Sequence, residues 1–333
     1  MHSVLDSDKR YFLITIDTEG DNLWSKPNNI TTNNATFLPR FQRLCETYGF
    51  KASYLTNYEM ATCPKFQDFG KDILRRDTGE IGMHLHAWNT PPLISITEND
   101  FFYQPYLLEY PHEILREKFT TMTGILHDIF EVRMVSHRAG RWGFDERYAR
   151  ILVENEYLVD CSVTPHVYWE GSIQEKVYDF TNCPDYGYFL DLEDITLPGN
   201  SPLLELPVTI VPNNNPLQKL SRFFREYPFI LKVFHRLFPS PYWLRPNGRN
   251  ITSMVRILKQ AVEQKRKYVE FMLHSSELMP GGSPLFHDEK AIALLYGNLE
   301  ELFHTASSLK FIGATLQDYY QIHLELTNSC KAS

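Results

Sequence analysis

The feature that most constrains the fold is the alternation of short apolar, β-rich runs with amphipathic helical patterns along the 333 residues. Such alternation predicts a parallel sheet whose crossover connections are helices. The expected strands are residues 11–16, 52–57, 80–86, 133–138, 157–163, 203–210, 268–274 and 310–315. The expected helices are residues 36–48, 111–130, 144–156, 251–266 and 287–307. We therefore expect a (β/α) barrel of seven or eight parallel strands rather than two domains.

Three long stretches interrupt the alternation. Residues 88–110 and 165–202 are rich in aromatic residues and proline, which favours ordered functional loops over disorder. Residues 213–250 carry seven Lys and Arg but one Glu, although the whole chain has a formal net charge of −8. We expect a single catalytic domain over residues 11–320, with residues 213–250 as a basic, aromatic, helical insertion within it.

The bulk composition excludes several classes of protein. A negative net charge argues against general nucleic-acid binding, which needs a basic surface. Five scattered cysteines without a C-x-x-C pair indicate reduced thiols. We see no signal peptide and no spanning helix, so we expect a cytoplasmic protein. Residues 213–250 could touch the inner face of a membrane peripherally, or form a lid helix whose basic face is solvated.

Reactive side chains follow the predicted strands at their carboxyl ends, where ligands bind in barrels and open α/β sheets. They come from five strands and include Asp17, Glu19, His84, His86, Arg138, Asp160 and His274. His84 and His86 are two residues apart, so on a strand both would point to one face. Two imidazoles and one carboxylate leave coordination positions open, as a catalytic Zn²⁺ needs.

The third ligand would come from Asp17 or Glu19, which share the same spacing. The other carboxylate could then act as a base on water, and His274 could protonate a leaving group, which is metal-assisted hydrolysis. A calcium loop starting at Asp17 is excluded, because its sixth residue is Asn22 and its twelfth is Asn28. Each residue also has an ordinary structural interpretation as a cap, a surface ion pair or a core histidine. All of these interpretations would have to hold by chance at the same edge of the sheet, so we favour a functional site.

These residues resemble, in the same order, five short motifs of the polysaccharide deacetylases, the NodB-homology or carbohydrate esterase family four. The resemblance runs from about residue 11 to about residue 315 and implies a deformed (β/α) barrel with long loop insertions. It also implies a divalent ion held by a carboxylate and two histidines, and the removal of N- or O-acetyl groups from sugars. Zn²⁺ is the expected ion, with Co²⁺, Mn²⁺ and Ni²⁺ as alternatives.

The first two motifs give the metal site. TIDTE, residues 15–19, resembles the family's T-F-D-D motif, which implies Asp17 as the catalytic base and Glu19 as a metal ligand. EIGMH, residues 80–84, resembles the entry to H-x-x-x-H. The position four residues after His84 holds Trp88, so the resemblance requires His86 as the second imidazole ligand.

The other three motifs give the remaining roles. RAGRWG, residues 138–143, is similar to R-x-P-x-G without its proline, which implies that Arg138 orients the base. DCS, residues 160–162, resembles D-S-S/D, so Asp160 would pair with Arg138 or line the pocket. Leu273 followed by His274 matches L-H and implies His274 as the general acid. We expect the substrate to contact Trp88, Arg141, Trp142 and Ser162.

The predicted function is therefore a metal-dependent carbohydrate de-N-acetylase, a hydrolase of carbon–nitrogen bonds other than peptide bonds. Its substrate would be an acetylated sugar, which the basic insertion suggests is diphosphate- or lipid-linked. The H-x-H form looks most like the branch associated with lipopolysaccharide biosynthesis, the WalW-like and WbmS-like proteins. One alternative is a glycan-binding pseudoenzyme of the same fold, and another is a metal-independent glycoside hydrolase using acids such as Asp17 and Asp160.

Overall fold

The computed structural model describes residues 9–25, 29–169, 178–212 and 241–331. Most of the predicted basic insertion, residues 213–240, lies outside the described residues, so its helical character and membrane contact stay predictions. In these described ranges no helix is both long and apolar enough to cross a membrane.

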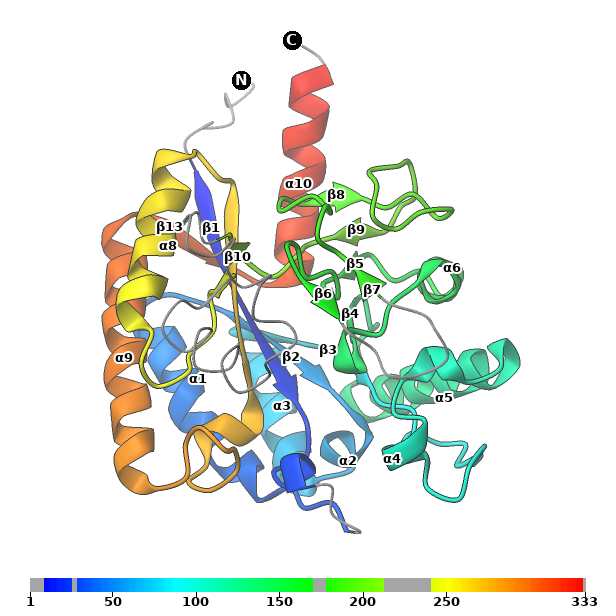
Figure 1. Ribbon diagram of the computed structural model, residues 1–333. Coiled ribbons are helices and arrows are strands. Elements are labelled where there is room, and N and C mark those ends of the chain that lie inside the picture. The colour runs from blue at the N-terminus through cyan, green and yellow to red at the C-terminus, as the bar shows by residue number, and fades with distance from the viewer. Residues whose placement is uncertain (1–8, 26–28, 170–177, 213–240, 332–333) are drawn as a thin grey trace, which may run out of the picture.

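A sheet of nine strands forms the centre of the fold (Figure 1). Eight of its strands lie in the spatial order β12 (Tyr268–His274), β1 (Arg10–Thr18), β2 (Ala52–Thr56), β3 (Gly79–Leu85), β4 (Ser136–Ala139), β5 (Val159–Asp160), β9 (Leu204–Glu205) and β8 (Tyr188–Phe189). The ninth, β13 (Phe311–Ala314), pairs with the first half of β1, and β2 pairs with its second half. Strand β1 therefore contacts three strands and lies at the centre of the molecule.

The sheet curls into a deformed barrel, as predicted. Its open edges are bridged by the segment that follows β9. Leu206 donates its N–H to the carbonyl of Asp160 at 2.8 Å, and Thr209 donates to the carbonyl of Glu270 on β12 at 3.2 Å. The segment thus joins β5 to β12 through single hydrogen bonds rather than through a regular ladder, which is why the barrel is deformed.

Each predicted strand overlaps a strand of the structure, with two corrections. Strand β8 runs antiparallel to β9, so the sheet is not wholly parallel. The predicted strand at 203–210 divides into β9 and β10 (Ile210–Val211), which pairs with β11 (Tyr242–Trp243) in a separate ribbon. Pro207 explains the division, because it has no N–H to donate to a ladder. The loop at 165–202 also holds a small ribbon of β6 (Tyr168–Trp169) and β7 (Tyr178–Asp179).

Helices cover the outside of the curled sheet (Figure 1). They are α1 (Leu38–Thr47), α2 (Tyr58–Ala61), α3 (Pro64–Arg75), α5 (His112–Phe130), α6 (Glu146–Glu154), α8 (Ile251–Glu263) and α9 (Glu289–Ser308). The short helix α4 (Asp100–Tyr103) lies instead in the loop that follows β3. The predicted helices correspond to α1, α5, α6, α8 and α9, whereas α3 and α10 (Leu316–Lys331) were not predicted. Along β1, alternate residues Phe12, Ile14 and Ile16 face this helical layer and join the larger apolar core.

The opposite face of the strands encloses a smaller apolar core. Leu13, Leu55, Val159 and Leu204 meet inside the barrel and are covered by α10. Tyr319 of α10 packs against Tyr268 at the start of β12, with ring centroids 5.1 Å apart. Helix α10 thus covers the amino ends of the strands. The carboxyl ends stay open for polar side chains.

The same alternation decides which side chains face the interior near those carboxyl ends. On β1 they are Thr15 and Asp17, and on β12 they are Glu270 and His274, where Asp17 lies in register with His274. Polar and charged side chains thus gather in the carboxyl half of the barrel, while the amino half holds the smaller apolar core together with one buried polar group, in which Ser53 and Ser136 donate to Glu80. This division creates the site.

Gly82 on β3 tests the packing of the barrel. A Cβ atom there would lie 2.8 Å from the carbonyl oxygen of Ser136 and 2.7 Å from Leu55 Cδ2. We expect Gly82→Ala to lower the free energy of unfolding by about 1–3 kcal/mol, because the strand must shift. Gly124 in α5 has open space around its Cα, so Gly124→Ala should raise stability by about 0.5–1 kcal/mol. Urea unfolding of both variants measures the difference, and equal stabilities would contradict this packing.

Candidate metal centre

A cavity of about 490 Å³ opens at the carboxyl ends of the strands. Its volume is that of a small-molecule site. The residues that line it are Asp17, Glu19, Leu23, Trp24, His84, His86, Trp88, Phe101, Tyr106, Ala139, Arg141, Trp142, Trp169, Arg245 and His274. Most of the predicted site residues are therefore gathered in one cavity. Of the aromatic side chains, Trp88, Phe101 and Tyr106 come from the loop at 88–110 and Trp169 from the loop at 165–202, whereas Trp24 follows β1 and Trp142 follows β4.

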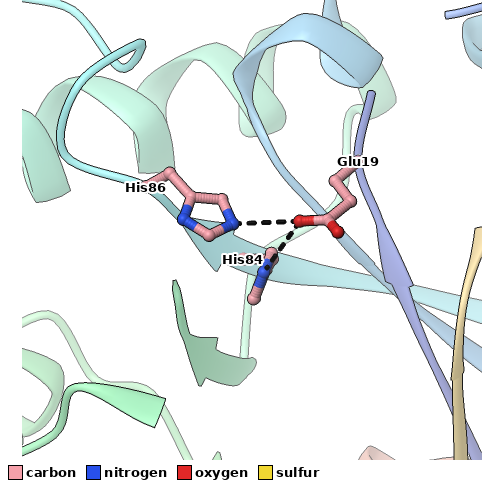
Figure 2. A group of neighbouring side chains, drawn as sticks. All are labelled: Glu19, His84 and His86. Carbon is pink, nitrogen blue, oxygen red and sulfur yellow. Dashed lines mark hydrogen bonds and ion pairs between the residues drawn. The ribbon is translucent and has the colours of Figure 1, made fainter. Parts of the chain in front are cut away.

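Glu19, His84 and His86 form the group of side chains that could hold a metal ion (Figure 2). Their ligand atoms all lie within 4.8 Å of one another, and all three residues are buried. His86 Nε2 lies 3.0 Å from Glu19 Oε2, and His84 Nε2 lies 3.6 Å from the same oxygen. Ligands about 2.1 Å from a tetrahedral ion are about 3.4 Å apart, so these spacings fit a Zn²⁺-type site.

The hydrogen bonds of His84 and His86 also leave one ring nitrogen of each free to bind a metal ion. His84 donates Nδ1–H to the backbone carbonyl of Arg138 at 3.0 Å, so its Nε2 is left with a lone pair. The Nδ1 of His86 is buried without a hydrogen-bond partner among the described residues. Gly140 packs so closely that a Cβ there would lie 2.5 Å from that nitrogen, which requires glycine beside the ring.

The electrostatics favour an anionic carboxylate and at least one neutral ring. Burial raises the pKa of Glu19, but hydrogen bonds from His84 and His86 outweigh burial and hold that pKa well below its usual value. Burial lowers the pKa of His86 to about 4. The pKa of His84 is raised in spite of burial, because Asp17 and Glu19 both lie near it. A divalent ion would replace the attraction between the Glu19 carboxylate and the two imidazoles. One carboxylate and two imidazoles are a donor set that fits such an ion.

Asp17 lies beside this group and is held by Arg138. Burial raises the pKa of Asp17, but the positive charge of Arg138 outweighs burial and lowers it overall. Arg138 Nη1 donates to Asp17 Oδ1 at 2.5 Å, and its Nη2 donates to Glu270 and, at 2.8 Å, to Thr15 Oγ1. Burial raises the pKa of Glu270 to about 7 despite this contact. Asp17 is thus an ionised carboxylate of fixed orientation in the cavity wall.

His274 lies on the opposite side of Asp17, with its Nε2 3.7 Å from Asp17 Oδ2 and 3.7 Å from Glu19 Oε1. Its Nδ1 lies 2.9 Å from Arg245 Nη2. Arg245 also donates to Glu277 Oε1 at 2.9 Å, and Glu277 accepts the backbone N–H of His274 at 2.8 Å. Arg245 and Glu277 therefore fix the ring and point its Nε2 into the cavity.

Two predicted site residues lie elsewhere. Asp160 neither pairs with Arg138 nor lines the cavity, because its Oδ1 lies 2.6 Å from His137 Nδ1 on the side of β4 and β5 that faces the helices. Ser162 is fully buried and accepts the N–H of Ala139 at 2.9 Å, so it does not reach a substrate. Both residues instead fix the backbone next to Arg138. Alternation along the chain turned Asp160 and Ser162 away from the cavity, while Cys161 between them faces the inner apolar core.

Trp88, Arg141 and Trp142 line the cavity, and their contact with a substrate stays a prediction. The Trp88 ring lies against the ring of His86, with centroids 4.3 Å apart. Trp88 therefore packs beside a candidate metal ligand and is not itself a ligand. The site also contains residues that the sequence did not single out, namely Trp24, Arg245, Glu270 and Glu277. Glu270 could have been found, because it is four residues before His274 on the same strand and therefore faces the same side.

Comparison with known proteins supports the fold. No protein-family model matches the sequence, and no curated protein does. The chain is similar in structure to a protein from Mycobacterium smegmatis with the provisional name polysaccharide deacetylase, at 13% identity and a TM-score of 0.54, covering 98% of this chain and 93% of that one.

Two further solved structures align over most of the chain. One is the Xyl-CE4 domain of a xylanase from a Trinervitermes trinervoides hindgut metagenome, at 9% identity, 95% and 91% coverage and a TM-score of 0.45. The other is a CE4 family pseudoenzyme from Bacillus anthracis, at 7% identity, 94% and 66% coverage and a TM-score of 0.43. The chain therefore shares its fold with the Mycobacterium smegmatis protein.

Removal of either histidine tests the metal site. We expect near-stoichiometric divalent metal in the purified protein, and loss of most of it in His84→Ala and in His86→Ala, because each removes one of three ligands. His287 is largely exposed, so His287→Ala is a matched control that should keep the metal. Mass spectrometry of untagged protein measures the content. Metal retained in His86→Ala would show that the second imidazole ligand is assigned wrongly.

Glu277 gives the site a predictable pH dependence. Burial raises the pKa of Glu277, but Arg245 and His274 outweigh burial and lower it to about 2. Since its unfolded pKa is about 4.3, ionised Glu277 stabilises the fold fully above that pH, and this stabilisation is lost as pH falls towards 2. The loss is about 3 kcal/mol at most.

We therefore expect Glu277→Gln to be less stable than the wild type at pH 7, with the difference narrowing between about pH 5 and pH 2.5. Urea unfolding of the two metal-free proteins at several pH values between 7 and 2.5 measures this difference in the free energy of unfolding. Glu300→Gln, on an exposed position of α9, is the matched control. A stability difference that does not change with pH would contradict the role of the buried Arg245–Glu277 pair.

Proposed function

We propose that this protein is a metal-dependent deacetylase that hydrolyses an acetamide, or an acetyl ester, on a sugar. The observation that supports the proposal best is the cavity itself. One wall holds a buried carboxylate and two imidazoles, Glu19, His84 and His86, while Asp17 and His274 face the same space. These are a metal ligand set, a base and an acid within reach of one bound group.

Glu19, His84 and His86 would hold the ion, with Zn²⁺ expected and Co²⁺, Mn²⁺ or Ni²⁺ as alternatives. When bound, the ion would polarise the acetyl carbonyl and lower the pKa of water. The pKa of Asp17 is lowered mainly by Arg138 against burial, so Asp17 is ionised at neutral pH and can accept a proton from the attacking water. Arg138 keeps the accepting oxygen oriented towards the cavity.

His274, as the imidazolium, would donate its Nε2 proton to the sugar nitrogen or oxygen as the bond from that atom to the acetyl carbon breaks, which leaves a neutral imidazole. The products are acetate and the free amine or hydroxyl. Arg245 and Glu277 hold the imidazole by its Nδ1 edge and backbone, so Nε2 is the atom that faces the substrate. The aromatic side chains of Trp24 and Trp142 are positioned in the wall to pack on sugar rings, whereas the Trp88 ring already packs against His86 and Phe101.

The pseudoenzyme alternative keeps one specific observation in its favour. Trp88 stands where the family has its second histidine, and its ring packs on His86. By contrast, the glycoside hydrolase alternative loses its carboxylate pair, because Asp160 does not line the cavity with Asp17. A role in lipopolysaccharide biosynthesis, a lipid-linked substrate and a cytoplasmic location stay predictions.

Replacement of Asp17 tests the proposed chemistry. Wild-type protein loaded with Zn²⁺ should release acetate from N-acetylated chitooligosaccharides or O-acetylated xylooligosaccharides. Asp17→Asn should lower kcat by about 10²–10⁴-fold, because the base is lost. The variant should keep its metal, since Asp17 is not in the ligand set.

Acetate release and metal content are measured on the same samples. Stoichiometric metal in the wild type without turnover of any acetylated sugar would favour the pseudoenzyme. Trp88→His would then be the informative variant. Acetate release that survives complete removal of metal would contradict the proposal.

A further inference from the structure

Arg141 is a cation in the cavity wall without a polar partner. Its guanidinium carbon lies 5.3 Å from the centroid of the Trp88 ring, and its side chain is exposed. Within the described ranges it forms neither a hydrogen bond nor an ion pair, and its guanidinium lies over the Trp88 ring. An arginine that faces a cavity in this way has all five of its N–H donors available.

The backbone at this point is held in an unusual conformation. Arg141 has φ 56° and Trp142 has φ 60°, so two consecutive residues with a Cβ occupy the left-handed region. Such conformations are unfavourable and persist where surrounding contacts enforce them. Here the turn is closed by the N–H of Gly143, which donates to the carbonyl of Gly140 at 3.1 Å. The result is that both side chains, Arg141 and Trp142, reach the cavity wall.

The other charges of the cavity are already paired. Arg245 is bonded to Glu277, and Asp17 accepts from Arg138. Glu19 lies between the two histidines. The charge of Arg141 also acts on Glu109, but that carboxylate accepts the N–H of Tyr106 at 2.9 Å and forms no ion pair with Arg141. In the described part of the cavity wall, Arg141 is thus the cation that an incoming anion can bind without displacing another group.

We propose that the substrate carries an anionic group, a phosphate or a carboxylate, and that the Arg141 guanidinium binds it beside the Trp88 ring. This inference rests on the proposed function and specifies its substrate class. A guanidinium presents paired N–H donors that match two oxygens of such a group. Because Trp88 packs on the candidate ligand His86, the anionic group lies near the acetylated end of the substrate. Neutral acetylated sugars leave this charge unmatched.

The kinetic test compares anionic and neutral sugars. Acetate release is measured from N-acetylglucosamine 1-phosphate, N-acetylglucosamine 6-phosphate and N-acetylmuramic acid, and from neutral N-acetylglucosamine. The wild type should prefer at least one anionic sugar by tenfold or more in kcat/KM. Arg141→Gln should reduce that preference about ten- to hundredfold, as expected for a hydrogen bond between charged groups. The phosphates and the carboxylate distinguish the two sources of negative charge.

Two variants control for charge and for general effects. Arg141→Lys keeps the positive charge and should retain a large part of the preference. Arg75 lies at the end of α3 with a largely exposed side chain, so Arg75→Gln should leave both rates and preference as in the wild type. An equal rate for anionic and neutral sugars in the wild type would overturn the inference, and so would a preference that Arg141→Gln leaves intact.

A binding measurement separates this inference from the proposed function. Calorimetry on protein from which metal has been removed by chelation and dialysis measures the affinity for each anionic sugar. Binding should weaken at least tenfold in Arg141→Gln and at high salt. If no acetylated sugar is hydrolysed but anionic sugars bind through Arg141, the proposed reaction fails while the anionic ligand stands. If wild type and Arg141→Gln bind the anionic sugars equally, the anionic ligand is ruled out.

Discussion

The site depends on one buried guanidinium. Arg138 is fully buried and bonds Asp17, Thr15 and Glu270 through its side chain, while its Nε donates to the carbonyl of Cys161 at 3.0 Å. Burial of an unpaired charge would be prohibitive, and removal of one partner of a buried pair costs about 3–5 kcal/mol. The strands that carry these partners must therefore meet around Arg138, and their meeting brings the reactive side chains together.

Arg138 also connects the proposed base, Asp17, to the candidate metal ligands. Its side chain fixes Asp17, and its backbone carbonyl accepts the Nδ1–H of His84. One residue on β4 thus sets the orientation of a carboxylate on β1 and the tautomer of an imidazole on β3. A shift of β4 would disturb both groups, which explains why Asp160 and Ser162 matter even though they lie outside the cavity. They hold the backbone around Arg138 from behind.

Two arginines at the carboxyl end of the barrel, Arg245 and Arg141, differ in their surroundings. Arg245 is committed to His274 and Glu277 and so organises the acid side of the cavity. Arg141, by contrast, is held at the wall by a strained turn and stays uncommitted. A uniform set of paired charges would suit a neutral substrate. The proposed anionic substrate would pair with the charge of Arg141.

The sequence by itself determined the strand order along the chain, because period-two alternation and helical spacing are local properties. It also determined that Asp17, Glu19, His84, His86 and His274 follow strands whose carboxyl ends meet. The tertiary structure alone decided that Glu270 shares Arg138, that Arg245 meets His274 across 29 residues, and that Asp160 faces the helices. Those outcomes depend on which face a short strand presents and on which distant segments pack together. Neither is encoded in local spacing.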